Sequence, residues 1–361
     1  MLKIRKATSL TLLFLLSGCH ILPLTITLST TKTSISSDIP ASTMPCVQAQ
    51  SSEQSELLTR ESIYSQAETA LSSSDFEKLE SYYSLYRQRT SRTPNGRWKL
   101  QLFYDGLFPA DYNHEKDWTS FEAKLLQWIK KYPKSPAAHI AYSSFLINRA
   151  WYFRGEGYAN EVPPEAWEPF YENVELARVS LEESKEFASS DPEWYVRMLT
   201  IARLQGWSQL EVNKLLKDAV SKEPYYQETY QTAFEYLLPK WSGSFSEAAD
   251  FADDAATITS KCEGRGMYAR IYWRAINLHP EFEENPFGSK ISWEKMKAGF
   301  EDIIALYPDA WNINNYARFA CLAEDKETTR TLLARIGDKP ILEAWPEQTT
   351  FSDCQTWASE P

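Results

Sequence analysis

Residues 292–307 read SWEKMKAGFEDIIALY, and this stretch decides the fold class. Its apolar residues follow one another at steps of three, four, three, one and three, beginning at Trp293, passing through Phe300 and ending at Tyr307. Those steps place them on one face of an α-helix. The sequence therefore predicts an amphipathic helix here.

Helical spacing also occurs elsewhere in the chain, whereas strand spacing is hard to find. Tyr226, Tyr230, Phe234 and Leu237 follow one another at steps of four, four and three. Strict alternation of apolar and polar residues, which would indicate strands, is not sustained. The chain holds only 12 glycines among 361 residues, which disfavours a turn-rich all-β fold. We therefore expect an all-α protein.

Prolines mark the expected ends of helices. Proline lacks a backbone N–H and disfavours helical geometry in the residue before it. Such boundaries occur at Pro133, Pro192, Pro224 and Pro308. Each of them is expected to close one helix and open the next.

Two segments are expected to form helical hairpins. One runs from Tyr226 through a turn at residues 241–244, and the other runs from Trp311 through a turn near Asp325 to Gly337. Small residues on one face and aromatic residues on the other suit closely packed helix pairs. This pattern resembles the tetratricopeptide class, whose repeat is about 34 residues. We expect tetratricopeptide-like hairpins, packed as a solenoid or a curled bundle.

Five aromatic-rich stretches carry a family resemblance. They are Trp151–Tyr158, Asp191–Tyr195, Leu238–Trp241, Tyr268–Trp273 and Trp311–Phe319. As a set they resemble the bacterial domain of unknown function 4034, over about residues 65–345. The resemblance implies a helical, tetratricopeptide-like domain, and no catalytic residue is carried over from it.

The first residues have the order of a secretory signal, with three basic residues within the first six, an apolar run over residues 10–16 and then small residues. Leu16-Ser17-Gly18-Cys19 resembles a bacterial lipobox, which implies cleavage before Cys19 and lipidation of its thiol. We therefore expect a signal peptide over 1–18, a flexible Ser/Thr-rich tether over 19–60 and a helical-repeat domain over 61–361.

Two other interpretations of this region stay open. Residues 7–31 carry no Asp, Glu, Lys or Arg, and about 20 apolar residues suffice for an uncleaved transmembrane anchor. Cleavage after residues 47–49 is the third option, although it lies far from the apolar run. The lipoprotein and the anchor both place the body outside the cytoplasm. His20, rather than Asp, after Cys19 resembles outer-membrane sorting, so we expect a lipid anchor in the outer membrane of a bacterial envelope, facing the periplasm.

The acidic charge of the chain excludes two classes of partner. The net charge is -11, and removal of the three basic residues of the leader would lower it to about -14. Binding of nucleic acid requires clustered Lys and Arg, and adhesion to anionic lipid requires the same. We expect no nucleic acid partner, and membrane attachment through the lipid of Cys19 alone.

The five cysteines permit disulfides if the protein lies outside the cytoplasm. With Cys19 lipidated, four thiols remain and three pairings are possible. We favour Cys321 with Cys354, which would close a loop of about 33 residues and stabilise the fold by roughly 3–4 kcal/mol. The alternative is that both are reduced thiols of the core.

No catalytic, metal-binding or cofactor-binding motif is found in the sequence. His139 lies in an Ala-rich helix, where a packed and hydrogen-bonded ring is the ordinary explanation, and no two of the four histidines have ligand spacing. Asp250, Asp253 and Asp254 share one helix face, which is typical of a solvated surface. The glycines of residues 154–157 are expected to end a helix rather than to bind a dinucleotide.

Arginine and asparagine residues interleaved with tryptophans are the candidate binding residues. They are Arg149, Trp151, Arg154, Trp241, Arg270, Trp273, Trp311, Asn315 and Arg318. Such residues on the inner surface of a helical array suit the capture of a peptide or a carboxylate. The alternative is structural, because buried Asn and Arg also cap helices and tie loops together.

From these observations we expect a membrane-tethered envelope lipoprotein whose helical domain binds a protein or peptide partner without catalysis. The alternative is an envelope hydrolase or lyase that acts on glycan or peptide. Two carboxylates of perturbed pKa facing each other in a pocket would identify it.

Overall fold

The computed structural model describes residues 44–46, 54–108, 115–155, 157–282, 286–288, 290–346 and 349–360, all within one compact unit, Ser34–Pro361. These ranges hold 15 α-helices and three short 3₁₀ helices, and they contain no strand. The predicted all-α fold class is confirmed.

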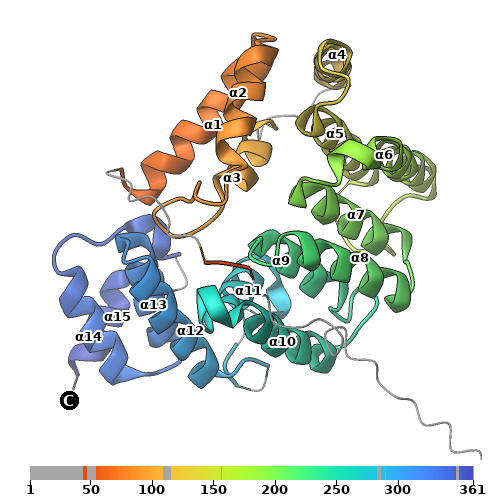
Figure 1. The fold of residues 1–361 in the computed structure, drawn as a ribbon. Coiled ribbons are helices and arrows are strands. Elements are labelled where there is room, and N and C mark those ends of the chain that lie inside the picture. Colours follow the sequence, from red (N-terminus) through yellow and green to blue (C-terminus); the bar gives the residue numbers. More distant parts are fainter. Residues whose placement is uncertain are drawn as a thin grey trace, which may run out of the picture. The chain divides into compact units, whose positions relative to one another are not determined.

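The elements follow one another along the chain as a series of helices joined by turns and by longer loops (Figure 1). The first are α1 (Glu56–Ser72), α2 (Phe76–Tyr86), α3 (Lys99–Gly106), α4 (Glu115–Lys131), α5 (Pro136–Arg154), η1 (Pro164–Ala166), α6 (Trp167–Ala188) and α7 (Pro192–Gln205). They are followed by α8 (Gln209–Lys222), α9 (Gln227–Tyr236), α10 (Phe245–Glu263), α11 (Gly266–Leu278), η2 (Pro280–Phe282), α12 (Trp293–Leu306), α13 (Ala310–Leu322), α14 (Lys326–Ile336), η3 (Leu342–Ala344) and α15 (Phe351–Ser359).

Neighbouring helices pack as pairs, as the hairpin pattern predicts. The most extensive packing joins α5 to α6, α11 to α12 and α13 to α14, while α1 packs on α3 and α7 on α9. The predicted turn at 241–244 separates α9 from α10, and the one near Asp325 separates α13 from α14. Residues 292–307, for which the sequence predicted an amphipathic helix, contain α12. This helix begins after Ser292, and the Ser292 side chain accepts a hydrogen bond from the backbone amide of Lys295.

The interior is built from two apolar clusters that share α7. Met198 and Ile201 of α7 belong to the cluster formed with α1–α6, whereas Leu199 and Ala202 belong to the cluster formed with α8–α15. Aromatic rings are prominent in both clusters, and Trp128 and Tyr230 are among the large side chains that are fully buried. Adjacent faces of one helix thus join the two halves of this core.

Two disulfides tie segments that are distant in sequence. Cys321 at the end of α13 is bonded to Cys354 in α15, the pairing that the sequence favoured. Cys46 is bonded to Cys262 near the end of α10, across 216 residues.

The predicted boundary of the tether is wrong at its C-terminal end. Helix α1 begins at Glu56 rather than near Glu61, because the Ser55 side chain accepts a hydrogen bond from the Leu58 amide and the Glu56 side chain is buried. Cys46, also inside the expected tether, is covalently attached to α10. The expected signal peptide, with Cys19 and His20, and most of the tether lie outside the described residues.

Candidate functional site

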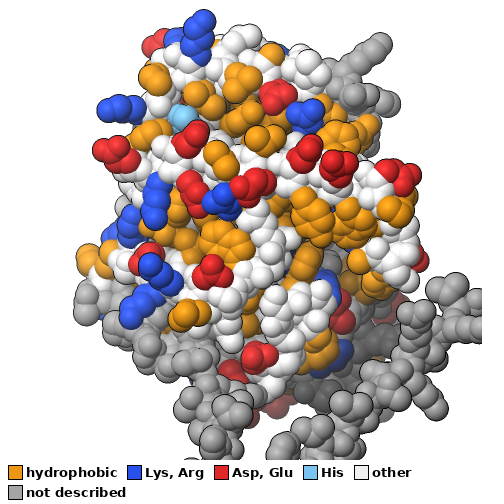
Figure 2. Space-filling view, turned by 90° about the vertical axis from the view of Figure 1, so that its right-hand side faces the viewer, with side chains coloured by type: hydrophobic (Ala, Val, Ile, Leu, Met, Phe, Trp, Pro, Cys, Tyr) orange, Lys and Arg blue, Asp and Glu red, His pale blue; other side chains and the backbone are white. Residues whose placement is uncertain are grey.

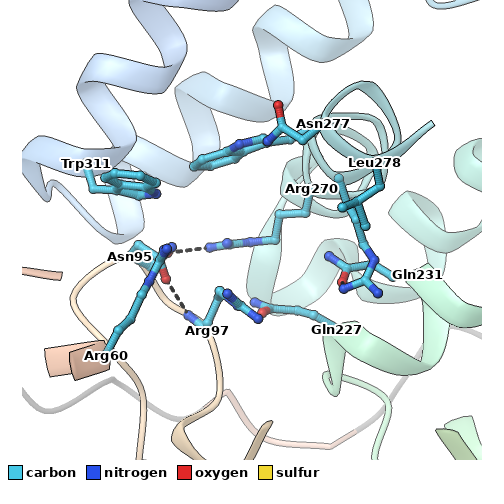
Figure 3. Close-up of a pocket in the computed structure, with 11 residues that line it drawn as sticks. Arg60, Asn95, Arg97, Gln227, Gln231, Arg270, Asn277, Leu278 and Trp311 are labelled. Atoms are coloured by element: carbon cyan, nitrogen blue, oxygen red, sulfur yellow. Dashed lines mark hydrogen bonds between the residues drawn. The ribbon is translucent and has the colours of Figure 1, made fainter. Parts of the chain in front are cut away.

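A cavity of about 210 Å³ is lined by residues of four helices and one loop. Its lining residues are Arg60 of α1, Asn95 and Arg97 of the loop before α3, Gln227 and Gln231 of α9, Arg270, Trp273, Arg274, Asn277 and Leu278 of α11, and Trp311 of α13 (Figure 3). Four of them are arginines, and none is an aspartate or glutamate. In a chain of net charge -11, this cavity therefore concentrates positive charge.

Arg270 is the most deeply buried of these arginines, with 4 % of its surface exposed. Its Nη2 donates to the backbone carbonyl of Asn95 at 2.7 Å, and its Nε has no hydrogen-bond partner among the described residues. Burial lowers the pKa of this guanidinium below its ordinary value. Arginine stays charged at neutral pH even so, which leaves a buried cation at the cavity wall.

The other three arginines are held by carboxylates outside the lining. Arg60 pairs with Glu56 at 2.6 Å and lies over the Trp311 ring, 4.7 Å from its centroid. Arg274 pairs with Glu228 at 2.9 Å. Arg97 approaches Asp105 only at 4.0 Å. These pairs orient the guanidinium groups.

The loop around Gly96 connects the elements of the cavity. The backbone N–H of Asn95 donates a hydrogen bond to the Glu56 side chain of α1 at 2.9 Å. The backbone carbonyl of Asn95 also accepts one from the Asn312 side chain of α13 at 3.3 Å. Gln227 of α9 donates to the Gly96 carbonyl at 3.1 Å. One loop therefore connects α1, α9, α11 and α13 around the same space, and Figure 3 shows its hydrogen bond to Arg270 of α11.

Of the nine predicted binding residues, the structure brings three together in the cavity: Arg270, Trp273 and Trp311. Two others have structural roles nearby. Asn315 donates to the Trp311 carbonyl of its own helix at 2.9 Å. Arg318 donates to the Ala344 carbonyl and to Asn277, and burial lowers its pKa to about 10.

The other four predicted residues lie elsewhere. Arg154 donates to the carbonyls of Gly155 and Gly157, the turn that ends α5. Its guanidinium lies over the rings of Trp151 and Trp167. These contacts hold the end of α5 in place.

Arg149 and Trp241 likewise have partners outside the cavity. Arg149 pairs with Glu122 of α4 at 3.3 Å. The Trp241 ring lies under the Arg203 guanidinium, 5.0 Å away. These contacts, like those of Trp151 and Arg154, are of the kind that the alternative, structural interpretation of the Arg/Trp pattern describes.

Sequence reasoning missed eight of the lining residues: Arg60, Asn95, Arg97, Gln227, Gln231, Arg274, Asn277 and Leu278. A signal for some of them was present. Arg270, Arg274 and Asn277 recur at steps of four and three, which places them on one face of a helix. A polar stripe of this kind on an amphipathic helix ordinarily faces solvent, so the pattern indicates a shared face but not the cavity that the structure shows.

Buried carboxylates do occur, but they do not line this cavity. Asp191 and Glu193 have no exposed surface, and burial raises the pKa of both, that of Glu193 to about 7. Asp191 accepts a hydrogen bond from Tyr104 at 2.8 Å, and Glu193 accepts one from Tyr226 at 2.5 Å. These phenols tie α3, α7 and α9 together in the core.

Histidines and acidic clusters have ordinary surroundings in the part of the chain that is described. The His139 ring lies 3.1 Å from the Pro133 carbonyl and packs on Phe187. Asp253 pairs with Lys295 of α12 at 2.7 Å. No group of three or more His, Cys, Asp or Glu suited to a metal ion is found among the described residues.

The outer surface differs from the cavity in its charge pattern. On the face shown in Figure 2, acidic and basic side chains alternate among apolar ones, with no continuous region of one sign. A shallow depression of about 260 Å³ between α4, α5 and α6 has a largely apolar wall that includes Leu176 and Val179. Neither feature gathers cations as the cavity does.

Comparison with known proteins assigns the chain to no family. No protein-family model matches it, and a search of curated proteins finds no significant relative. The resemblance to the domain of unknown function 4034 stays a prediction. None of the helices in the described ranges combines the length and the apolar character that a membrane span requires.

Proposed function

We propose that this protein is a membrane-tethered lipoprotein of the bacterial envelope whose helical domain binds a protein or peptide partner. The observation that carries the proposal is the arginine-lined cavity, which presents four guanidinium groups and two indole rings, with no carboxylate among its described lining residues. Arginine and tryptophan are the residues that most often dominate binding energy at interfaces. The residues that line the cavity belong to helices far apart in sequence. The packing of these helices against one another holds the guanidinium groups and indole rings in fixed positions.

The anchor is a separate part of the proposal, supported by the lipobox-like stretch that ends at Cys19. We expect Cys19→Ser to abolish incorporation of a fatty-acid probe in growing cells and to release the protein from the membrane fraction. Persistent labelling of the variant would contradict lipidation at this residue.

Partner binding is tested by crosslinking in intact cells, followed by purification of the full-length protein. Trp311→Ala removes an indole from the cavity wall, and we expect it to lower the yield of the crosslinked partner by about tenfold, the loss that about 1.4 kcal/mol of binding energy produces. Trp167→Ala is the matched control, because an arginine guanidinium also lies over the Trp167 ring, but Trp167 is outside the cavity.

A partner recovered equally from the wild type and both variants would not be bound through the cavity, and the proposal would be wrong. Recovery of no crosslinked species from the wild type would contradict it as well.

A further inference from the structure

The hydrogen-bonding groups that line the cavity but have no partner are mainly donors. Gln231 accepts from Arg274 at 3.4 Å, and Asn277 accepts from Arg318 at 2.8 Å. An arginine side chain can only donate hydrogen bonds, so the side-chain oxygens of Gln231 and Asn277 face the arginines. The NH₂ group of each side chain is then left for another partner. No hydrogen bond from either NH₂ group is found within the described residues. Two amide donors are therefore left over.

Arg270 adds a positive charge to these donors. It is the only lining arginine without an ion pair in the part of the chain that is described, and just one of its nitrogens, Nη2, donates there. The nine-tenths-buried side chain borders the cavity, with its Nε unpartnered. Donors gathered around one cation that has no direct ion pair favour an anion.

The net charge of the lining residues indicates which class of anion suits the cavity. Arg60 and Arg274 are already neutralised by close carboxylates, at 2.6 and 2.9 Å, and Arg97 is partly neutralised at 4.0 Å. Arg274 has a second carboxylate, Glu235, at 3.4 Å, and Glu263 acts on Arg270 from a greater distance, so the remaining charge is at most that of about a single cation. A phosphate monoester carries about -1.5 to -2 at neutral pH, whereas a carboxylate carries one negative charge and presents two oxygens that match a guanidinium.

One hydrogen-bond acceptor of the cavity favours the end of a peptide chain over a simple carboxylic acid as the ligand. Gln227 donates through its Nε2 to the Gly96 carbonyl, so its Oε1 is the arm without a hydrogen bond among the described residues. An amide N–H next to the carboxylate, as at the last peptide bond of a chain, would supply the matching donor.

The size and walls of the cavity fit one terminal residue. Its volume of about 210 Å³ is below the ~300–1,000 Å³ of sites that enclose drug-sized ligands. Trp273 and Trp311 provide aromatic walls, and Leu278, which is 56 % exposed, lies at the rim. A flat, apolar side chain suits such walls.

From these observations we propose that the cavity binds the carboxyl-terminal residue of a peptide or protein, with the free carboxylate at Arg270 and an aromatic side chain against Trp273 and Trp311. This inference rests on the proposed function and names the part of the partner that the cavity recognises.

The test is fluorescence anisotropy with the full-length protein and the labelled peptide Gly-Ser-Ala-Gly-Phe, made either as the free acid or as the carboxamide. We expect the acid to bind about tenfold more tightly than the carboxamide. Equal affinity for the two peptides, or no binding of either, would overturn the inference.

Gln231→Glu supplies the decisive variant, because it changes one lining atom and places a negative charge in the cavity. We expect it to weaken binding of the acid by about tenfold and to change binding of the carboxamide less than about twofold. Gln127→Glu, the same change at an exposed position of α4, is the matched control and should bind as the wild type does. Unchanged binding of the acid by Gln231→Glu would overturn the inference.

3-Phenylpropanoate, which has the ring and the carboxylate but no amide, tests the assignment to a chain end. We expect it to compete at least about tenfold more weakly than the unlabelled peptide; equal competition would overturn that assignment. If crosslinking finds a cavity-dependent partner while acid and carboxamide bind alike, only this inference fails. If neither a partner nor a peptide is bound, the proposed function fails too.

Discussion

At the scale of single residues, Gly96 controls the geometry of the cavity. Its φ of +91° lies in the region that glycine tolerates and other residues avoid. A Cβ atom there would lie 2.6 Å from the Tyr307 ring and 2.7 Å from the Arg270 guanidinium. The close approach of this backbone lets the adjacent Asn95 carbonyl reach Arg270.

We expect Gly96→Ala to lower the free energy of unfolding by about 2–4 kcal/mol, because it combines backbone strain with displacement of a buried arginine. Gly155→Ala is the control, since Gly155 also has a positive φ but would place its Cβ in open space, and it should lose about 1 kcal/mol. Urea unfolding of both variants measures the difference. Similar losses in the two would show that the contacts of Gly96 are unimportant.

Single residues also show why the site was only partly predictable. Arg270 and Trp273 stood out because arginine and tryptophan are three residues apart on one helix. Arg60 and Asn95 gave no such signal, because they meet Arg270 only through packing of elements up to 210 residues apart. Local patterns indicate which face a side chain occupies, but they do not indicate which distant face lies opposite.

At the scale of elements, three hairpin turns share one geometry. The amides of Asp75, Trp207 and Asp325 each donate to the carbonyl of an alanine five residues earlier, at 2.8 to 2.9 Å. In each turn the residue just before the donor has a positive φ, near 57° or 67°. This closing bond between a helix end and the next helix is typical of a Schellman turn.

The alanines are Ala70, Ala202 and Ala320, and all three are buried. A small residue at this place lets the following helix pack closely. These three hairpins therefore share a turn geometry, although the residues at their turns differ.

Asp325 combines this turn with contacts that Asp75 lacks. Both cap the helix that follows, but Asp325 also accepts from Lys297 at 2.9 Å and from Trp293 at 3.0 Å. Burial of Asp325 opposes its ionisation, yet these hydrogen bonds outweigh burial and lower its pKa to about 2.

We expect Asp75→Ala to cost about 1 kcal/mol, the usual loss of a helix cap, and Asp325→Ala to cost about 2–3 kcal/mol. Because the folded-state pKa of Asp325 is depressed, its contribution is complete above the ordinary carboxyl value of 3.8 and is lost as the pH falls toward 2. Denaturant unfolding at pH 7 and at pH 3 measures both effects. Equal costs at pH 7 would contradict a role for the added contacts.

At the scale of the described unit, the two disulfides differ in what they constrain. The bond between Cys321 and Cys354 closes a local loop, with 33 residues of separation, whereas Cys46 to Cys262 spans 216. In the chain-entropy treatment, a longer loop restricts the unfolded state more. The longer bond also fixes the segment before α1 to the end of α10, which packs on α11.

We expect Cys46→Ser with Cys262→Ser to destabilise the protein by about 1–2 kcal/mol more than Cys321→Ser with Cys354→Ser. Thermal unfolding of the two double variants under oxidising conditions provides the comparison, and reduced wild type should be less stable than either. A larger loss from the shorter loop would show that native contacts around Cys354, rather than loop length, decide the effect.

The arrangement around Asn95 has a consequence for folding kinetics. Most helix pairs in this unit join neighbours in sequence and can form quickly, but the Asn95 carbonyl binds Arg270 and Asn312 across 175 and 217 residues. Contacts of such high contact order form slowly. During synthesis the early helices are therefore complete well before the cavity exists, and a refolding chain should regain its helical signal before Asn95, Arg270 and Asn312 come together.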